Sequence, residues 1–335
     1  MALELTGKKI LLFSPEFFGY GVAIKSALEK KSASVYYFNE RPDNKFLTKV
    51  LIRLGLNLFL KRKIYLYYLE KIFSVRDKNI DYLFLVDPET VDCKLISEFK
   101  KYWPEIKVII YMWDSIKNRK NALKIFPVVD KIFSFNPHDL NFNEKIQFLP
   151  LFYLDKYKII ADKRVRDYRY DLAFIGTLHS DRYEIVKKII KLSQSSGLKV
   201  YCFFYSPSKL LFFFQTLLIG SFRGVNKDDV SFTSMKEREV FDTILNSRIL
   251  IDIHHPGQEG LTMRAIESLG AKRKLLTTND KIKNYDFYNT KNIHIFDINS
   301  IDIDNIFFNS GYEEISNNIY KKYSIDSWLS VIFSD

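Results

Sequence analysis

The sequence predicts an α/β fold in which two Rossmann-like domains face each other across a cleft. Two observations lead to this prediction. Short apolar runs alternate with segments of helical spacing, and the alternation begins again after a charged stretch at residues 155–169. Short apolar strands separated by helices are typical of a parallel sheet that is covered on both faces. The length of 335 residues also corresponds to about two ordinary domains.

The first half of the chain contains six segments with the character of strands. The apolar run at 8–14 is closed by Pro15, and residues 34–38 (SVYYF) are β-branched and aromatic. The remaining strands are expected at 80–86, 108–112, 131–135 and 146–149, and helices at 22–30, 46–73, 91–102 and 122–129.

The second half repeats the pattern after residues 155–169, whose charged and irregular sequence predicts a linker. Strands are expected at 170–175, 199–204, 249–253, 274–278 and 293–296, and helices at 181–195, 237–246, 261–269 and 325–333. We therefore expect domains at 1–155 and 170–320. The C-terminal helix in 321–335 is expected to cross back to the first domain.

The formal net charge of +11 requires an anionic partner or another explanation. Residues 1–150 hold 25 Lys and Arg against 17 Asp and Glu, whereas residues 151–335 hold 26 against 23. Nucleic acid, an anionic membrane and anionic small molecules are the three candidate partners. The N-terminus is not typical of a signal peptide, no apolar run is long enough to cross a membrane, and two cysteines cannot form a disulfide framework. A cytoplasmic protein is therefore expected.

The loop that follows the expected strand at 249–253 is a candidate ligand site. In parallel sheets, ligands bind beyond the carboxyl ends of the strands. The loop (HHPGQEG) is too polar for the core and leads into a helix whose N-terminal N–H groups favour a phosphate or carboxylate. The candidate ligand-binding residues here are His255, Gly257, Gly260, Thr262, Arg264 and Glu267, and Glu259 lies in the same loop. The alternative is that Glu259 is an ordinary acidic residue of the loop and Glu267 an ordinary solvated acidic residue of the helix, without a role in binding.

A second candidate site follows the strand at 170–175, in the sequence FIGTLHSDR. Glycine allows a ligand to approach the backbone closely, and an arginine can pair with a diphosphate in a fork geometry. The candidate ligand-binding residues are Gly176, Thr177, His179, Ser180 and Arg182. The alternative is a capped helix that carries a surface arginine.

Together these segments resemble the nucleotide-sugar site of GT-B fold glycosyltransferases. Many retaining members of that family carry two glutamates separated by seven residues, as Glu259 and Glu267 are. The resemblance implies that Glu267 holds the ribose hydroxyls of the donor, that Glu259 lies near the transferred sugar, and that the 176–182 loop faces the donor phosphates. The motifs SPEFFGYG, YMWDSIKN and FIGTLHSDR make the whole chain resemble CgeB-like bacterial surface-polysaccharide (lipopolysaccharide or capsule) biosynthesis proteins.

The chain departs from the GT-B pattern at two places. Lys272, Arg273 and Lys274 stand where the family usually has glycine and proline, and the segment at 255–257 is unusual for the family. A His-Pro pair in this region occurs in some transferases that use CMP-activated acidic sugars. That donor class is therefore an alternative.

Two acids in the first half are candidates for a catalytic base. Asp114 follows the expected strand at 108–112 and could deprotonate an acceptor hydroxyl if the reaction inverts configuration. The alternative is an Asx turn or a cap for the next helix. Glu16, in the loop after the first strand, is a weaker candidate. If Glu259 acts as in retaining enzymes, the configuration of the sugar is kept, and the sequence leaves both outcomes open.

Metal-binding, Walker-type and complete dinucleotide motifs are absent, so no metal or cofactor is expected beyond the nucleotide-sugar co-substrate.

The leading expectation is thus a glycosyltransferase with a nucleotide-sugar donor and a glycan acceptor that is lipid-linked. Segment 45–73 is basic and rich in leucine and aromatic residues, and segment 209–222 is shorter and more apolar. Both could contact an anionic membrane, and the alternative is that both are core helices. The expected location is the cytoplasm, peripheral at the inner face of the membrane. A sugar-nucleotide epimerase of the same architecture is an alternative. A nucleic-acid-binding protein is the least favoured, because no such motif is present.

Overall fold

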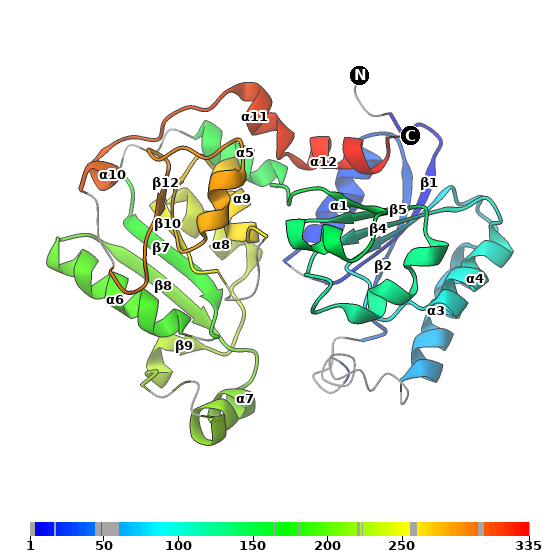
Figure 1. The fold of residues 1–335 in the computed structure, drawn as a ribbon, viewed down its shortest axis with the longest axis horizontal. Coiled ribbons are helices and arrows are strands. Elements are labelled where there is room, and N and C mark those ends of the chain that lie inside the picture. The colour runs from blue at the N-terminus through cyan, green and yellow to red at the C-terminus, as the bar shows by residue number, and fades with distance from the viewer. Residues whose placement is uncertain are drawn as a thin grey trace. The chain divides into compact units, whose positions relative to one another are not determined.

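The structure is a computed structural model that describes residues 4–16, 18–43, 48, 60–163, 165, 167–179, 181–219, 222, 224–254, 260–300 and 305–334. The chain divides into two compact units (Figure 1). The first unit contains Met1–Leu151 and Ile325–Asp335, and the second contains Phe152–Ser324.

The first unit is built on a parallel sheet of six strands in the order β2-β1-β3-β4-β5-β6. Its strands are β1 (Lys9–Ser14), β2 (Ser34–Asn39), β3 (Tyr82–Val86), β4 (Lys107–Met112), β5 (Lys131–Ser134) and β6 (Ile146–Phe148). All six strands expected from the sequence are confirmed. The chain changes direction across the sheet between β1 and β3, which is the switch point of a doubly wound sheet.

Helices cover both faces of this sheet. They are α1 (Tyr20–Glu29), α3 (Lys61–Val75) and α4 (Cys93–Tyr102), with the 3₁₀ helices η2 (Lys120–Lys124), η3 (Phe126–Val128) and η4 (Pro137–Asn141). The expectation of one α-helix at 122–129 is wrong, because Pro127 lies in the middle of it and cannot donate its backbone hydrogen bond. Most of the expected helix at 46–73 before Lys61 lies outside the described residues.

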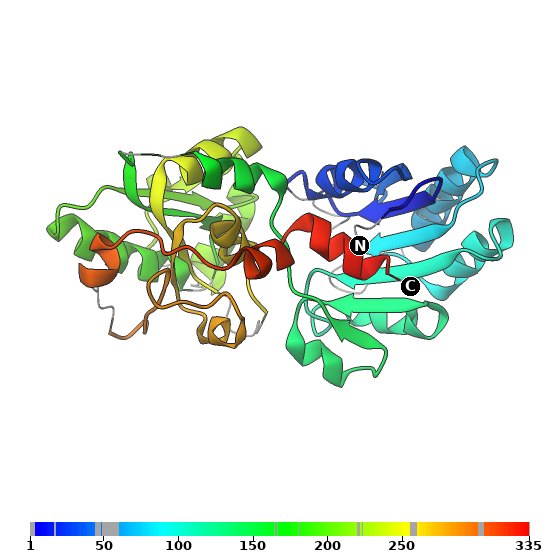
Figure 2. The same cartoon turned by 90° about the horizontal axis from the view of Figure 1, so that it is seen from above.

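The C-terminal helix α12 (Ile325–Ile332) completes the core of the first unit. Trp328 is 2% exposed, and its ring lies 4.8 Å from that of Tyr111 on β4 and 5.9 Å from that of Phe84 on β3. Figure 2 shows α12 in red beside α1, and Lys31 after α1 pairs with Asp326 at 3.0 Å. The last eleven residues of the chain therefore belong structurally with its first half.

The second unit contains another parallel sheet of six strands, in the order β12-β11-β10-β7-β8-β9. The strands are β7 (Tyr170–Thr177), β8 (Val200–Tyr205), β9 (Val230–Ser231), β10 (Ser247–Asp252), β11 (Lys274–Thr277) and β12 (Ile293–Ile295). Only the two-residue strand β9 was not anticipated. Numbered within the unit, this is the 3-2-1-4-5-6 order of the dinucleotide-binding Rossmann fold, and its switch point lies between β7 and β10.

The helices of the second unit correct one expectation. They are α5 (Asp155–Asp162), α6 (Arg182–Ser195), α7 (Lys209–Phe214), α8 (Glu237–Leu245), α9 (Met263–Gly270), α10 (Asn305–Asn309) and α11 (Asn317–Lys322), with the shorter turns η5 (Gln215–Ile219), η6 (Lys227–Asp229) and η7 (Asp280–Asn284). The predicted linker at 155–169 is wrong over its first half, which forms α5. Tyr157 and Ile160 of α5 are buried, and this tertiary burial stabilises a helix whose other residues are mostly charged.

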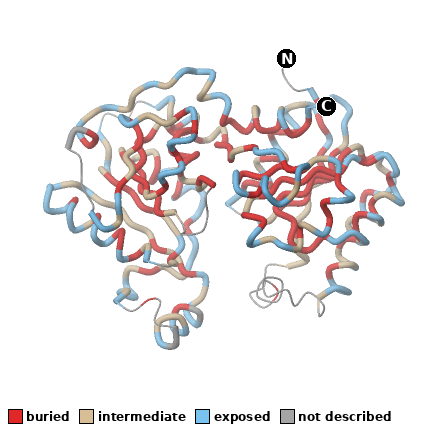
Figure 3. Tube along the Cα trace, viewed as in Figure 1, coloured by how far each residue is buried: buried red, intermediate tan, exposed pale blue. Residues whose placement is uncertain are grey.

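The central strands of both sheets, β1, β3 and β4 in the first unit and β10 and β11 in the second, are deeply buried (Figure 3). Consecutive side chains of β1, β3 and β4 point to opposite faces of the sheet, and nearly all of them are 0% exposed, so both faces are covered. A sheet that is buried on both faces leaves its strand ends as the places where polar groups can meet a ligand. The two switch points are therefore where functional side chains should be sought.

One glycine in the second unit has no room for a side chain. A Cβ at Gly270, the last residue of α9, would lie 2.5 Å from Cγ and 2.6 Å from Cβ of Tyr153. Tyr153 is 0% exposed and donates its hydroxyl to the carbonyl of Tyr320, whose hydroxyl donates to the carbonyl of Gly270. The Tyr153 atoms are at the root of the side chain and cannot swing away.

We therefore expect Gly270→Ala to destabilise the second unit by about 1–3 kcal/mol through overpacking. Gly311→Ala is the matched control, because a Cβ there meets nothing within 4 Å. Urea unfolding followed by far-ultraviolet circular dichroism would measure both variants. Equal midpoints for the two variants would contradict the prediction.

Candidate functional site

Arg182 joins the two strand ends at the switch point of the second unit. Its Nη1 donates to the carbonyl of Thr177 at 3.0 Å, and its Nη2 donates to the carbonyl of Ile253 after β10. Burial lowers the pKa of this guanidinium, and Asp252 opposes that effect. Its Nε is buried and has no hydrogen-bond partner among the described residues. A largely desolvated cation held by neutral carbonyls favours an anionic ligand.

Gly176 is required by the packing around this arginine. A Cβ there would lie 2.7 Å from the Phe174 ring and 3.2 Å from Nη1 of Arg182. Thr177 is exposed at the end of β7, and His179 is half-buried with its carbonyl accepting from the backbone of Arg182 at 3.3 Å. The structure thus brings Gly176, Thr177, His179 and Arg182 together at one edge of the sheet.

A second network fixes the start of α9. Thr262 is the N-cap residue: its hydroxyl accepts from the backbone of Ala265 at 3.2 Å and donates to Asp252 at 2.8 Å. Thr277 at the end of β11 donates to the other oxygen of Asp252 at 3.3 Å. Burial raises the pKa of Asp252. This carboxylate therefore ties the N-terminus of α9 to the ends of β10 and β11.

Glu267 and Arg264 lie one turn further along α9. Glu267 is 6% exposed, accepts from the Tyr157 hydroxyl of α5 at 2.6 Å, and pairs with Arg264 at 2.7 Å. These two contacts orient the Glu267 carboxylate. Gly260 is buried, and its carbonyl accepts from Asn279 at 3.5 Å.

Four of the candidate residues lie outside the described residues. They are Ser180, His255, Gly257 and Glu259. Their neighbours on the chain are described: His254 donates its backbone N–H to the Thr278 hydroxyl at 3.1 Å, so the loop leaves β10 beside the end of β11.

The first unit places Asp114 in a turn after β4. Asp114 accepts from the backbone of Ser115 at 2.8 Å and from the Asn118 side chain at 2.9 Å, whereas an Asx turn would accept from the backbone two residues on. It also pairs with Arg119 at 3.2 Å and is about one third exposed. The turn and a catalytic role are compatible, because the carboxylate remains partly accessible.

Glu16 lies in the exposed loop after β1. Burial raises the pKa of Tyr37 on β2, and the negative charge of Glu16 raises it further. The loops after β1 and β4 meet through the rings of Tyr20 and Trp113, whose centroids are 5.2 Å apart. Glu16 and Asp114 therefore belong to neighbouring loops.

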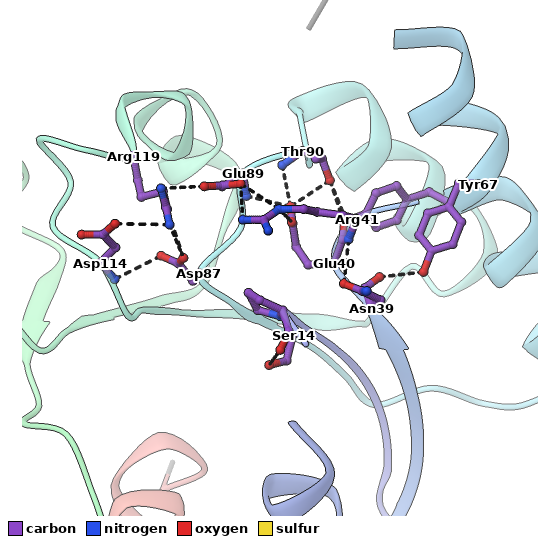
Figure 4. Close-up of polar contacts among 12 residues, drawn as sticks. Ser14, Asn39, Glu40, Arg41, Tyr67, Asp87, Glu89, Thr90, Asp114 and Arg119 are labelled. Carbon is purple, nitrogen blue, oxygen red and sulfur yellow. Dashed lines mark hydrogen bonds and ion pairs between the residues drawn. The ribbon is translucent and has the colours of Figure 1, made fainter. Parts of the chain in front are cut away.

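The first unit also holds a charged cluster, of which the sequence analysis had named only Asp114 as a site candidate (Figure 4). We call it the carboxylate cluster, and it comprises Glu40, Arg41, Asp87, Glu89, Thr90, Asp114 and Arg119. Arg119 pairs with Asp87 at 3.0 Å and with Glu89 at 2.6 Å. Burial alone would lower the pKa of the Arg119 guanidinium, but the surrounding carboxylates raise it. Burial raises the pKa of Asp87, against the opposing charge of Arg119.

Glu40 is the most deeply buried member of the carboxylate cluster, at 0% exposed. Its Oε1 accepts from the backbone N–H groups of Glu89 and Thr90 and from the Thr90 hydroxyl. Its Oε2 is buried without a hydrogen-bond partner among the described residues, and Arg41 lies 3.7 Å away. Burial raises the pKa of Glu40 to about 8, although Arg41 opposes this effect.

The missed residues share one signal in the sequence. Glu40, Asp87 and Asp252 each lie at or directly after the end of a strand, where the chain turns from apolar to acidic. The rule that ligands bind at carboxyl ends of parallel strands pointed to these positions. The segment after β3 (VDPET) would have been found by applying that rule to every strand in turn.

Two classes of site have no counterpart in the described part of the chain. No group of three or more His, Cys, Asp or Glu side chains there could hold a metal ion. Among the same residues, no helix is long and apolar enough to cross a bilayer.

Comparison with solved structures identifies the architecture. Alr3699/HepE of Anabaena, in complex with UDP and glucose, matches with a TM-score of 0.59 and 8% identity, covering 97% of this chain and 98% of that chain. The catalytic domain of Arabidopsis thaliana starch synthase IV, bound to ADP and acarbose, matches at 0.54 and 8%, covering 98% and 96%. The chain has the GT-B fold.

A third GT-B match is the UDP-GlcNAc 2-epimerase of Methanocaldococcus jannaschii, with a TM-score of 0.51 and 12% identity, covering 96% of this chain and 98% of that chain. Identities of 8–12% establish the shared fold and not a shared reaction. No protein-family model and no curated protein matches the sequence. The expectation of two Rossmann-like domains is confirmed.

Proposed function

We propose that this protein is a glycosyltransferase that moves a sugar from a nucleotide-activated donor to a glycan acceptor. The observation that carries the proposal is the switch point between β7 and β10. A glycine without room for a Cβ, a half-buried arginine and a capped helix N-terminus meet there. This combination suits a nucleoside diphosphate, because it offers cationic and N–H donors with close backbone access.

Each element at this switch point has a proposed role towards the donor. Arg182 would stabilise the negative charge that develops on the diphosphate leaving group, together with the N-terminus of α9. Glu267, oriented by Tyr157 and Arg264, would accept from the ribose hydroxyls. The related folds that contain UDP or ADP support a nucleotide-sugar donor, with a CMP-activated acidic sugar as the alternative.

The acceptor is proposed to bind the first unit, whose residues 1–150 hold 25 Lys and Arg against 17 Asp and Glu. Asp114 would be the base of an inverting reaction, with Glu16 as the weaker candidate, whereas Glu259 near the donor sugar would support retention. We propose a lipid-linked glycan of a bacterial surface polysaccharide as the acceptor, processed at the inner face of the membrane. A basic surface would favour the anionic headgroups there.

The test is a thermal-shift screen against UDP-, ADP-, GDP-, dTDP- and CMP-sugars, because a ligand that binds only the folded state raises apparent stability. Arg182→Met should weaken binding of the active donor about 10- to 100-fold, the loss expected for a charge-assisted contact. Arg238→Met is the control, since Arg238 is 92% exposed on α8. No shift with any donor would overturn the proposed function. Unchanged affinity in Arg182→Met would overturn the assigned site.

A sugar-nucleotide epimerase is the second candidate function, favoured by the epimerase match over nearly the whole of both chains. The two reactions differ in what the donor alone produces. An epimerase converts the nucleotide-sugar to its epimer without an acceptor, whereas a transferase releases the nucleoside phosphate only on transfer or slow hydrolysis. Proton nuclear magnetic resonance of the donor incubated with the protein would separate the two.

A further inference from the structure

An apolar ridge runs along α7 and η5 in the second unit. It consists of Leu210, Phe213, Phe214 and Leu217, which are spaced as one face of a helix. Their exposed fractions are 81%, 63%, 50% and 59%. Among the described residues, the three most exposed large apolar side chains all belong to this ridge. Scattered exposed apolar residues are ordinary, but a contiguous ridge marks an interaction surface.

The ridge rests on a packed base. Phe212, between the ridge residues in sequence, is 8% exposed, and its ring stacks on Phe222 and meets Phe232 edge-on, both at 5.7 Å. The Thr216 hydroxyl donates to the carbonyl of Phe212 at 2.7 Å. The ridge is therefore held outward by its own core contacts, and its exposure is a consequence of ordered packing.

The charge around the ridge indicates what covers it. Residues 206–226 contain Lys209 and Arg223 and no acidic residue. Lys209 is exposed at the start of α7, with its ammonium 5.8 Å from the ring of Phe232. An apolar ridge with an exposed lysine at its start complements an anionic bilayer, in which the apolar side chains enter the acyl boundary and the ammonium meets the headgroups.

The size of the ridge argues against a second protein chain. Four such side chains, exposed by half or more, offer roughly 400–600 Å² of apolar surface. A stable protein interface needs about 800 Å² on each partner. Shallow insertion into a bilayer needs no such area, because the acyl boundary conforms to whatever is inserted.

We propose that α7 and η5 form a membrane-docking ridge that inserts Leu210, Phe213, Phe214 and Leu217 into the interface of an anionic bilayer. The inference rests on the proposed function, because a lipid-linked acceptor would require the protein to bind at the membrane. Binding of the ridge to lipid can be measured without any donor.

The test is co-sedimentation of the full chain with phosphatidylcholine vesicles that contain or lack phosphatidylglycerol. The ridge variant combines Leu210→Gln, Phe213→Gln, Phe214→Gln and Leu217→Gln. The control variant combines four exposed apolar residues outside both membrane-contact candidates: Val22→Gln, Phe142→Gln, Ile159→Gln and Leu192→Gln, which are 39–56% exposed. We expect the wild type to bind the anionic vesicles, the ridge variant to bind at least about tenfold more weakly, and the control to stay within about twofold.

A second measurement keeps the test independent of the stability of a quadruple variant. Phe213→Trp should add tryptophan fluorescence to that of the wild type. This added fluorescence should shift to shorter wavelength with anionic vesicles and should be quenched by brominated lipids. No vesicle binding by the wild type, equal binding by the ridge variant, or no shift of the added emission in Phe213→Trp would overturn the proposal. Ridge-dependent dimers in lipid-free light scattering would also overturn it, in favour of a second copy. The donor-induced thermal shift should persist in the ridge variant, which separates this outcome from failure of the proposed function.

Discussion

Replacing Arg119 with methionine is expected to destabilise the first unit by about 3–5 kcal/mol, the cost of removing one partner from a buried ion network. Arg119 is 13% exposed and neutralises three carboxylates, Asp87, Glu89 and Asp114. Methionine keeps much of the side-chain volume but leaves the buried Asp87 without the Arg119 cation, and leaves Glu89 with Arg41 alone. Urea unfolding followed by tryptophan fluorescence measures this directly, because all three tryptophans, Trp103, Trp113 and Trp328, lie in the first unit.

Two controls define the origin of the effect. Arg238→Met removes an exposed ion pair on α8 and should cost less than about 1 kcal/mol. Lowering the pH should partly restore Arg119→Met, because the stranded carboxylates can then take up protons. A stability within about 1 kcal/mol of the wild type at neutral pH would show that the carboxylate cluster does not depend on Arg119.

Glu40→Gln is expected to flatten the dependence of stability on pH. Burial raises the pKa of Glu40 to about 8 in the folded protein, whereas an unfolded glutamate titrates at about 4.3. Between these values the folded state holds a proton that the unfolded state has released. The wild type should therefore lose about 1.4 kcal/mol of unfolding free energy per pH unit from about pH 5 to 7.5 through this group. Glutamine has no proton to lose, so this contribution should disappear.

The measurement is a series of urea unfolding curves at half-unit pH steps, again with tryptophan fluorescence. Glutamine can keep the acceptor that Oε1 provides to Glu89 and Thr90, so the variant should fold. Glu70→Gln is the control, because Glu70 lies on α3 with its side chain 70% exposed. Identical slopes for wild type and Glu40→Gln would mean that Glu40 is already ionised in the folded protein.

The positions of the strands followed from local sequence. Runs such as 8–14 and 80–86 are largely apolar, because strands of a doubly covered parallel sheet are buried on both faces. Gly176, Arg182 and Thr262 were singled out because they follow strands, and the structure places them at the same switch point. Residues 155–162 failed as a prediction, because the burial of Tyr157 against α9 cannot be seen in a charged segment.

The basic segment at 45–73 and the donor loop at 255–259 are two places where the sequence-based prediction stands without a structural account. Both lie largely outside the described residues. The apolar segment at 209–222 was ambiguous in sequence between core and surface. Its exposure in α7 and η5 resolved that ambiguity, since Phe212 faces the core while its neighbours Phe213 and Phe214 do not.

The sequence by itself determined the class of fold, the two repeated βα patterns and the uneven distribution of charge, because each of these depends on composition and short-range periodicity. Only the tertiary structure decided which strand ends are neighbours. Arg119 meets Asp87 across 32 positions, and Glu40 meets the Glu89 backbone across 49. Such pairings depend on the spatial order of strands, which is set by how the crossover helices pack on the two faces of the sheet. The carboxylate cluster and the hydrogen bonds by which Arg182 joins the ends of β7 and β10 could therefore be seen only in the structure.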